Sequence, residues 1–539
     1  MLAHSEQTSS PSDENGNSNR PGAGGAVSTS SAPATNAALG VLRHGGNAVD
    51  AAVAAAWALG VCEPGSSGLG GQTVMLIHRA DGTAVVIDGH SYAPAAVSLA
   101  TVDKRQQSIG YRACTVPSTP ATLDYAQRKY GVLSRADVMT PAIRLADEGY
   151  PTTALQERQY RWVREPLRAS EAASKLFLVK GEIPTLRYIF RQPELAQTLT
   201  RMMEAGVEDF YHGRLARDIA DDMQRNGGLL SQQDLENCTL PVECNPISAA
   251  YRGFEVVSIP PPGGGCHLLF ALKVLEEISR VTDWTDDIDW YEHIALATYS
   301  AFANRERHTR GLKDFSEELA NELLSDANVS VIARELSSGN LPQYRRSAEG
   351  PGDTTHLTVA DRRGNVVALT QSIKSLFGAK VANPKLGFVY NNYLRTCPRF
   401  LHTSQLRAGC CPRSNAAPTV VLRQYAGRQQ PVMALGATGA RRIISAMLHV
   451  MTSVLDRGHS LDEAVAAPRL HALLSRKLWV ERPLATVPVL SRLGQHFTFD
   501  RILRKHSYSM GSVQAVHWLD DGMVAVAADP RREGLACAL

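Results

Sequence analysis

A β-hairpin about two-thirds of the way along the chain is the feature that most limits the folds open to it. The stretch HLTVADRRGNVVALTQSI contains two β-rich runs joined at Arg363, Gly364 and Asn365. Glycine and asparagine in so short a connection favour a tight turn, so the two runs are predicted to pair as antiparallel strands. The hairpin follows directly on GDTT, which places Thr354 and Thr355 at the start of its first strand.

Helical and β-rich segments alternate on both sides of this hairpin. A capping box, Ser460 with Glu463, opens a further helix near the C-terminal end. Helices packed outside two hairpin-rich sheets predict an α/β fold, a four-layer αββα sandwich. We expect helices at residues 33–42, 48–59, much of 132–223, 267–278 and 440–455, and strands at 73–78, 84–89, 251–260, 387–390, 419–422, 432–435, 513–518 and 523–527.

Composition excludes several classes of protein. The 539 residues are 44% hydrophobic and 20% charged with a net charge of +3, which is typical of a globular protein without a dominant electrostatic partner. The basic residues are scattered and form no aromatic-interleaved stretch, so nucleic acid is not favoured as a partner. No run approaches the roughly 20 apolar residues of a membrane span.

The N-terminal 24 residues are polar and rich in serine, asparagine, proline and glycine, so we expect segment 1–24 to be disordered. This segment has neither a basic start nor an apolar core of the kind found in secretory signals. A cytoplasmic location is therefore expected.

The nine cysteines are odd in number and lack CxxC spacing, which indicates neither a disulfide framework nor a metal site. Free thiols are the default interpretation. The tandem Cys410 and Cys411 near Cys397 leaves open a loop disulfide.

The two threonines raise a chemical question. A threonine hydroxyl is a poor nucleophile at neutral pH and needs a base, which its own α-amine supplies once the residue becomes a chain terminus. The bond between Asp353 and Thr354 is a plausible site for that cleavage, because the Thr354 hydroxyl can attack the preceding carbonyl and give an ester that water cleaves. On chemistry alone, an ordinary strand start is the more common explanation of such a sequence.

Several stretches in a fixed order resemble the γ-glutamyltranspeptidase family of N-terminal nucleophile hydrolases. The resemblance runs from about residue 25 to about residue 535 and looks most like the bacterial, glutathione hydrolase-like branch without a secretory signal. Its motifs are GGNAVDAAVAAAWALGVCEPGSSGLGG, GYRACTVPSTPATLDYAQRKYG, NGGLLSQQDL, YRGFEVVSIPPPGGG, GDTTHLTVADRRGNVVALTQSI, GATGARRI and ADPRREG.

The resemblance implies self-cleavage between Asp353 and Thr354. It gives a large subunit, 25–353, and a small catalytic subunit, 354–539, that form a heterodimer. Thr354 is then the nucleophile, with its new α-amine as the base and the hydroxyl of Thr355 beside that amine. The family's second threonine corresponds to Ser372, which keeps a hydroxyl.

The family's oxyanion hole, a Gly-Gly pair of backbone N–H donors, becomes Gly439 and Ala440. Losing one such donor typically costs about 3 kcal/mol of transition-state stabilisation, and an alanine that keeps the turn retains its N–H.

The residues that correspond to the family's substrate-binding residues differ from the family pattern. The family's carboxylate-binding arginine corresponds to His90, and its serine pair to Ser414 and Asn415. The asparagine that binds the α-ammonium becomes Lys374. The two residues that complete that ammonium site become Tyr393 and Thr396.

With these residues the pocket suits an anionic acyl group better than a zwitterionic one. A buried substrate ammonium without a partner is costly, and a nearby lysine repels it. Lys374, with His90, then pairs a substrate carboxylate. The alternative is that Lys374 faces solvent and other residues recognise the γ-glutamyl group.

Remaining motifs have structural explanations. The glycine-rich EPGSSGLGG and PPPGGG lack the context of a nucleotide-binding loop, so close backbone approach near the site is expected instead. His356 and His267 are expected to be structural.

Three functions are consistent with these residues. The resemblance implies an autoprocessed γ-glutamyl transferase and glutathione hydrolase-like enzyme, acting on a small-molecule amide without cofactor or metal. An amidohydrolase for a glutaryl-like or oxo-acid amide is the alternative. An unprocessed, inactive scaffold protein is the third.

Overall fold

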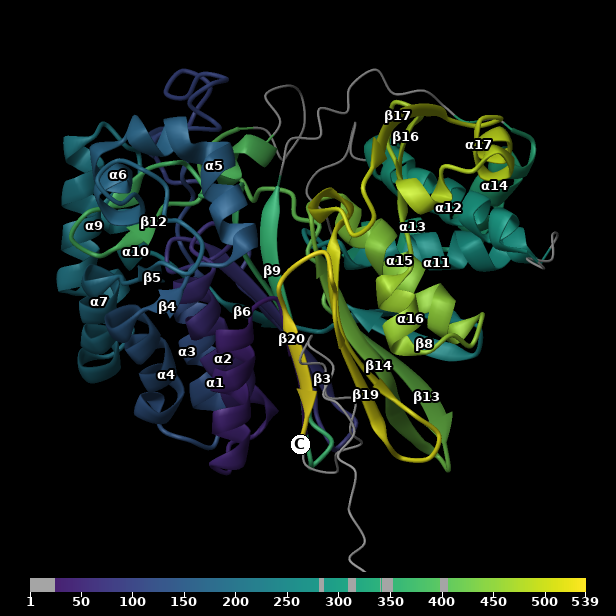
Figure 1. Ribbon diagram of the computed structural model, residues 1–539, viewed down its shortest axis with the longest axis horizontal. Helices are drawn as coiled ribbons and strands as arrows, with labels where there is room; N and C mark the ends of the chain where they lie inside the picture. The colour runs from purple at the N-terminus through teal and green to yellow at the C-terminus, as the bar shows by residue number, and fades with distance from the viewer. Residues whose placement is uncertain (1–24, 281–285, 309–316, 340, 342–351, 398–405) are drawn as a thin grey trace, which may run out of the picture.

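Two antiparallel β-sheets face each other in the middle of the molecule, and helices cover the outer face of each (Figure 1). This arrangement confirms the predicted four-layer αββα sandwich. The computed structural model describes residues 25–280, 286–308, 317–339, 341, 352–397 and 406–539. The segment 1–24 that the sequence predicts to be disordered lies outside these residues.

The first sheet has seven strands, and the predicted hairpin of β9 and β10 lies near its middle. The strands pair antiparallel throughout. In spatial order they are β20 (Leu535–Ala538), β1 (Gly25–Thr29), β9 (Asp353–Asp361), β10 (Val366–Lys374), β2 (Gln72–His78), β3 (Ala84–Asp88) and β6 (Val242–Cys244).

The second sheet has six strands, also antiparallel, and β14 at its centre packs against β9 and β10 of the first sheet. In order they are β19 (Val524–Ala528), β18 (Ser512–Trp518), β14 (Arg428–Thr438), β13 (Thr419–Tyr425), β8 (Phe254–Ser258) and β7 (Ile247–Tyr251).

Two groups of helices form the outer layers and stand on opposite sides in Figure 1. The first group is α1 (Ala32–Arg43), α2 (Ala48–Cys62), α3 (Thr119–Tyr130), α4 (Arg135–Glu148), α5 (Ala154–Arg168), α6 (Glu171–Phe177), α7 (Pro193–Ala205), α8 (Asp209–His212), α9 (Arg214–Arg225) and α10 (Gln232–Glu236). The second is α11 (Gly265–Ser279), α12 (Asp287–His308), α13 (Glu317–Leu324), α14 (Asp326–Ser337), α15 (Arg442–Leu455), α16 (Leu461–Ala466) and α17 (Val487–Leu493).

Short elements complete the chain outside the two main sheets. They are the strand pairs β4 (Tyr150–Pro151) with β5 (Ile189–Phe190) and β11 (Ala382–Asn383) with β12 (Phe388–Val389), the three-stranded sheet of β15 (Leu470–Ala472), β16 (Lys477–Glu481) and β17 (Thr498–Leu503), and the 3-10 helices Tyr111–Ala113, Tyr393–Thr396, Arg482–Leu484 and Tyr508–Met510.

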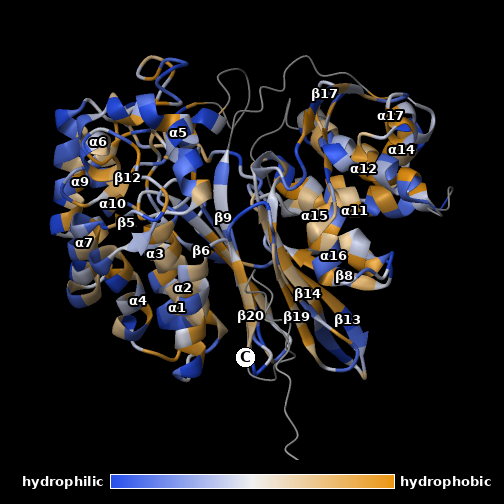
Figure 2. Cartoon of the chain, viewed as in Figure 1, coloured by the Kyte–Doolittle hydropathy of each residue, from blue (hydrophilic) through white to orange (hydrophobic). Residues whose placement is uncertain are grey.

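The hydrophobic core is divided by the two sheets. One cluster lies between the first sheet and its helices, one between the second sheet and its helices, and a third between the sheets, where Leu76 and Val420 are fully buried. Figure 2 shows the same division, with hydrophobic residues along β14 and α15 and hydrophilic residues on the outer helices such as α9.

Helix α2 is the most buried helix of the first layer. All its residues except Gly60 are buried, and Asn47 and Asp50 form the capping box that starts it. A helix that is hydrophobic on every side belongs inside a protein. It packs against β9, which carries the two threonines, and against β10, which carries Ser372.

The structure differs from the prediction within one expected strand, and it contains elements that the sequence pattern missed, among them α3, α12–α14, α17 and β15–β17. The expected strand 251–260 is a hairpin, because Arg252 and Gly253 both adopt positive φ and turn the chain between β7 and β8. The strands β1 and β20, which the sequence pattern missed, pair with each other at one edge of the first sheet. The other predicted strands and helices are confirmed, including α16 with its capping box.

Candidate active site

Thr354 is the second residue of β9 and is buried between the two sheets. Its Oγ1 donates a hydrogen bond to the carbonyl oxygen of Asp353 at 2.7 Å and lies 3.2 Å from Oγ of Ser372. Ser372 Oγ donates to the same carbonyl at 2.8 Å. Two hydroxyls therefore converge on the carbonyl group that precedes Thr354.

The carboxylate of Asp353 accepts a hydrogen bond from the Thr354 N–H at 2.9 Å and is also bound by side chains from the C-terminal part of the chain. Its Oδ2 accepts a hydrogen bond from the Tyr508 hydroxyl at 2.5 Å, and its Oδ1 forms an ion pair with Arg532. The guanidinium of Arg532 also lies 4.9 Å from the centre of the Tyr508 ring. This pairing fixes Asp353 on one side while its carbonyl faces the hydroxyls of Thr354 and Ser372.

A fully buried ion network anchors the segment that supplies Arg532. Arg531 pairs with Glu481 at 2.6 Å and with Asp529 at 3.2 Å, and Asp529 pairs with Arg469 at 2.7 Å. Buried charges are tolerated when they are paired in this way. The terminal ADPRREG motif thus positions Arg532.

Thr355 points away from the cavity, as strand alternation requires of the residue after Thr354. Its hydroxyl donates to Ser30 Oγ at 3.1 Å and also contacts Glu63. Burial raises the pKa of Glu63, and Arg532, 3.6 Å away, opposes that shift.

A small cavity adjoins Thr354 on the inner face of β9. It has a volume of ≈ 20 Å³, and one water needs a cavity of roughly 10–15 Å³. Its lining contains no carboxylate among the described residues, and consists of Gln72, Val74, Thr354, Thr370, Ser372, Lys374, Tyr393, Ser414, Asn415, Ala416, Ala440 and Ile443.

The structure brings most of the site residues predicted from sequence to this cavity. Thr354, Ser372, Lys374, Tyr393, Ser414, Asn415 and Ala440 all line it. Tyr393 is buried, and its hydroxyl interacts with Ser372 and Gln72. Asn415 Oδ1 accepts a hydrogen bond from Arg305 at 2.8 Å.

Lys374 gives the cavity its positive charge. It follows a β-bulge between Gln371 and Lys374, and its φ is 82°. Burial lowers its pKa to about 7. Four nearby arginines act in the same direction: Arg395, Arg441, Arg305 and Arg442.

The turn after β14 contains Gly439 and Ala440, the two residues predicted to supply backbone donors. Gly439 has φ 114° and Ala440 has φ 58°, a left-handed conformation that is uncommon for alanine. Ala440 therefore keeps the turn in which the family pattern has glycine. A Cβ on Gly352 would lie 2.6 Å from Ala440 Cβ, so the turn approaches the cleavage segment closely.

Five of the predicted residues lie outside the cavity lining: Asp353, Thr355, Gly439, His90 and Thr396. His90 Nδ1 pairs with Asp88 Oδ1 at 2.6 Å. The Thr396 hydroxyl donates to the Tyr393 carbonyl at 2.9 Å within the same 3-10 helix. Their side chains are thus engaged with neighbours in the chain.

The glycine-rich stretch EPGSSGLGG packs its backbone against the site, as expected. A Cβ on Gly71 would lie 2.5 Å from the Ser372 carbonyl oxygen, and one on Gly70 would lie 2.2 Å from that of Val389. These contacts require glycine, and they bring Gln72 to the cavity.

The two histidines singled out in the sequence are structural. His356 is fully buried and contacts the hydroxyls of Thr370 and Thr358 at 2.8 and 3.2 Å, and burial lowers its pKa to about 3. His267 is buried at the start of α11, where burial lowers its pKa. A neutral imidazole suits both positions.

Sequence reasoning missed Gln72, Tyr508 and Arg532. Arg532 belongs to the ADPRREG motif of the family resemblance, and Gln72 directly follows the glycine-rich motif that ends at Gly71, so a signal was available for both. Tyr508 carried no signal, because it reaches Asp353 only through the fold.

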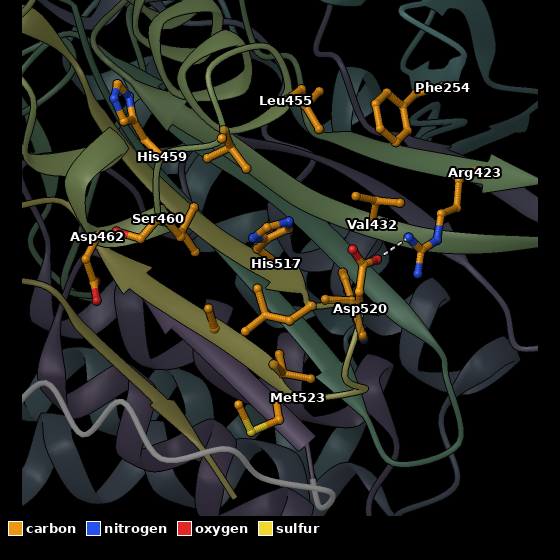
Figure 3. A pocket seen from close by; sticks show the side chains of 17 residues that line it. Phe254, Arg423, Val432, Leu455, His459, Ser460, Asp462, His517, Asp520 and Met523 are labelled. Carbon is orange, nitrogen blue, oxygen red and sulfur yellow. Dashed lines mark hydrogen bonds and ion pairs between the residues drawn. The ribbon is translucent and has the colours of Figure 1, made fainter.

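A larger hollow, ≈ 610 Å³, lies elsewhere on the second sheet and shares no lining residue with the cavity at Thr354. Figure 3 shows His517 near its middle and the ion pair of Arg423 with Asp520 at one side, at 2.5 Å. None of the site residues predicted from sequence lies in it.

Within the described residues, no group of three or more His, Cys, Asp or Glu side chains is arranged to hold a metal ion. Nor does any helix in that part of the chain have the length and apolarity needed to cross a membrane.

Comparison with known proteins gives consistent matches. A family model described as gamma-glutamyltranspeptidase matches residues 34–539. The glutathione hydrolase proenzyme of Escherichia coli (strain K12) is 30% identical over 94% of this chain and 90% of its own length. The acylase ACY 1 proenzyme of Pseudomonas sp. (strain V22) is 33% identical over 83% of this chain and 82% of its own.

Solved structures show the same likeness. The cephalosporin acylase from Bacillus halodurans superposes with a TM-score of 0.84 at 26% identity, covering 100% of this chain and 99% of that one. The gamma-glutamyltranspeptidase of Helicobacter pylori gives a TM-score of 0.53 at 31% identity over 56% of this chain and 89% of that one.

Proposed function

Because this chain belongs to the gamma-glutamyltranspeptidase family, we propose that it is a self-processing amidohydrolase with Thr354 as its nucleophile. The observation that carries the proposal is the convergence of the Thr354 and Ser372 hydroxyls on the Asp353 carbonyl. The first reaction is then cleavage of the chain itself, into a large subunit ending at Asp353 and a small subunit starting at Thr354.

In this self-cleavage, Thr354 Oγ1 attacks the Asp353 carbonyl carbon, and the hydroxyl proton passes to the nitrogen that leaves. Ser372 stabilises the developing oxyanion by donating to the carbonyl oxygen. This step frees the α-amine of Thr354, and water then cleaves the resulting ester, which restores the Thr354 hydroxyl and leaves Asp353 with a terminal carboxylate. The ≈ 20 Å³ cavity is too small for an acyl group, so the mechanism requires that the site widens when the chain is cleaved.

In the mature enzyme, the free α-amine of Thr354 takes the proton from the hydroxyl, which attacks the substrate amide. The N–H groups of Gly439 and Ala440 are proposed to hold the oxyanion, and Ser372 to orient the nucleophile. The acyl group then passes from Thr354 to water or to an amine.

The cavity favours an acyl group that ends in a carboxylate and lacks an ammonium. Lys374 lines it, four arginines lie near that lysine, and the described lining contains no carboxylate. A buried ammonium in this field is unpaired and repelled, whereas a carboxylate is paired. A glutaryl-like amide therefore fits the charge, and the acylase names among the relatives support this candidate.

A γ-glutamyl amide such as glutathione is the second candidate. The names of the glutathione hydrolase relatives favour it. The Ser414 and Asn415 pair, which lines the cavity, supplies hydrogen bonds for its α-carboxylate.

A denaturing gel tests the nucleophile. The purified wild-type chain is expected to give two bands, whereas Thr354→Ala gives the single full-length band of 58.4 kDa. Thr354→Ser retains a hydroxyl and is the matched control, expected to cleave more slowly. A wild-type preparation that stays at full length would contradict the proposal and support the inactive scaffold.

Hydrolysis of two matched anilides then tests the acyl group. The processed enzyme is expected to cleave the glutaryl anilide with a higher kcat/KM than the γ-glutamyl anilide. A clear preference for the γ-glutamyl compound would overturn the anion-pocket candidate and leave the Thr354 mechanism standing.

A further inference from the structure

Two cysteines next to the candidate site have their sulfur atoms in contact. Cys397 Sγ lies 3.2 Å from Cys410 Sγ, and both residues are buried in a small apolar cluster with Ala93 and Leu394. A disulfide needs a separation of about 2.05 Å, so the sulfurs need to approach by about 1 Å.

Hydrogen bonds to the preceding part of the chain hold both cysteines in place. The Gln107 amide donates to the carbonyls of Leu394 and Cys397 at 2.9 and 3.0 Å. The Ala93 N–H donates to the Cys410 carbonyl at 2.9 Å. The contact between the sulfurs thus follows from two separately anchored backbones.

The two cysteines belong to different walls of the cavity at Thr354. Cys397 follows the 3-10 helix that supplies Tyr393, and Cys410 precedes the segment that supplies Ser414. A bond between the two sulfurs joins these walls covalently.

We propose that Cys397 and Cys410 form a redox site, which hydrogen peroxide converts to a disulfide that ties the Tyr393 wall of the cavity to the Ser414 wall. The site is independent of the proposed catalytic function. Both thiols are buried, so a molecule as small as peroxide suits the site better than a bulky disulfide reagent.

The surroundings distinguish the two thiols. A hydrogen bond from Cys397, together with Arg407, lowers the pKa of Cys410 to about 7, and the same contact raises that of Cys397. Burial instead raises the pKa of Cys62 and Cys266 to about 12. Because the thiolate is the reactive form, Cys410 is the attacking sulfur.

The reaction proceeds in two steps. The Cys410 thiolate attacks one peroxide oxygen, the O–O bond breaks, and the hydroxide released takes a proton from solvent, leaving a sulfenic acid. The sulfur of Cys397 then attacks the Cys410 sulfur, the S–O bond breaks, and the leaving hydroxide takes the Cys397 proton as water. Two thiols and one peroxide give one disulfide and two waters.

Peptide mapping of the full chain tests the site. The reduced protein is treated with hydrogen peroxide, unfolded, alkylated and digested without reductant. We expect two fewer alkylated thiols than the nine of the reduced chain, a linked pair of peptides containing Cys397 and Cys410, and full reversal by dithiothreitol. The melting temperature should rise on oxidation, because the link restricts the unfolded chain.

Two variants act as controls. Cys411→Ser is expected to form the same link, whereas Cys397→Ser is expected to form none and to leave a sulfenic acid at Cys410 that dimedone traps. The reduced melting temperature of each variant verifies the fold. Full alkylation of all nine thiols, a link to Cys411 or between molecules, or a sulfinic acid at Cys410 in the wild type would each overturn the proposal.

Discussion

Asp353 has two contacts of different origin at the proposed cleavage site. Its carbonyl receives the hydroxyls of Thr354 and Ser372, which the sequence motif predicts. Its carboxylate pairs with Arg532, 179 positions away, which no local pattern predicts. We expect this ion pair to position the scissile carbonyl, since it fixes the same residue from the other side.

Arg532→Met is therefore expected to slow self-cleavage. Removing one partner of a buried ion pair costs about 3–5 kcal/mol because it leaves the other charge uncompensated. If only about 1.4 kcal/mol of this loss affects the transition state, the rate of self-cleavage falls about tenfold. The measurement is the appearance of the two bands over time after synthesis.

The double variant Asp353→Asn with Arg532→Met is the matched control, because it removes both charges. It is expected to recover part of the lost rate, and its melting temperature separates a cleavage defect from a folding defect. Equal rates for the wild type and Arg532→Met would show that the pair does not position the bond.

Lys374 makes the selectivity of the proposed enzyme depend on pH. Its pKa is lowered to about 7 by burial and the neighbouring arginines, so the side chain is charged below that pH and loses its charge above it. A substrate carboxylate pairs only with the charged form. Affinity for a glutaryl anilide is thus expected to fall as the pH rises through about 7.

Lys374→Arg keeps the charge throughout this range and is the control. The ratio of kcat/KM for the wild type to that for Lys374→Arg, measured on the glutaryl anilide, should decline above pH 7, and the ionisation of the Thr354 amine cancels in this ratio. A ratio independent of pH would mean that Lys374 does not contact the substrate.

At the scale of elements, the glycine-rich connection from α2 to β2 shapes the site through its backbone. Its sequence is glycine-rich like that of a phosphate-binding loop. It lacks the remaining residues of a nucleotide-binding motif, and we therefore predicted that it packs against the site. The structure confirms that role, because a Cβ on Gly71 would lie 2.5 Å from the Ser372 carbonyl oxygen.

Gly71→Ala is expected to displace β10 at Ser372, with a destabilisation of about 1–3 kcal/mol from overpacking and slower self-cleavage. Gly40→Ala, in α1 with no atom within 4 Å of the added Cβ, is the control and should be neutral or slightly stabilising. Thermal unfolding and the gel assay measure the two effects. Unchanged cleavage in Gly71→Ala would show that the loop does not set the position of Ser372.

Two of the elements that sequence reasoning missed, β1 and β20, lie at the ends of the described chain. β1 and β20 are short, and each reads as an ordinary polar or alanine-rich segment until it pairs with its neighbour. The hairpin of β9 and β10 was predictable because its strands are adjacent and its turn is marked by Gly364.

For the whole molecule, the proposed cleavage separates two chains that share both sheets. In the first sheet, β1 lies between β20 and β9, and β10 pairs with β2. In the second, β13 pairs with β8. Each sheet therefore contains paired strands of which one precedes Thr354 and the other belongs to the segment that starts there.

The two subunits are accordingly expected to stay together after cleavage. They should elute as one species in size-exclusion chromatography without denaturant, and separate only when urea unfolds both in a single transition. The uncleaved Thr354→Ala chain, which should elute at the same volume, is the control. Subunits that separate under native conditions would contradict this prediction.

The layered fold, the central hairpin, many of the helices and the pair of residues at the proposed cleavage site could be predicted from the sequence alone. These depend on local periodicity, turn residues and ordered motifs, all of which are short-range properties of the chain. The contacts between side chains distant in sequence were visible only in the folded chain: Arg532 with Asp353, Tyr393 with Ser372, and Cys397 with Cys410. Such contacts depend on how distant strands pack and register, which no local pattern specifies.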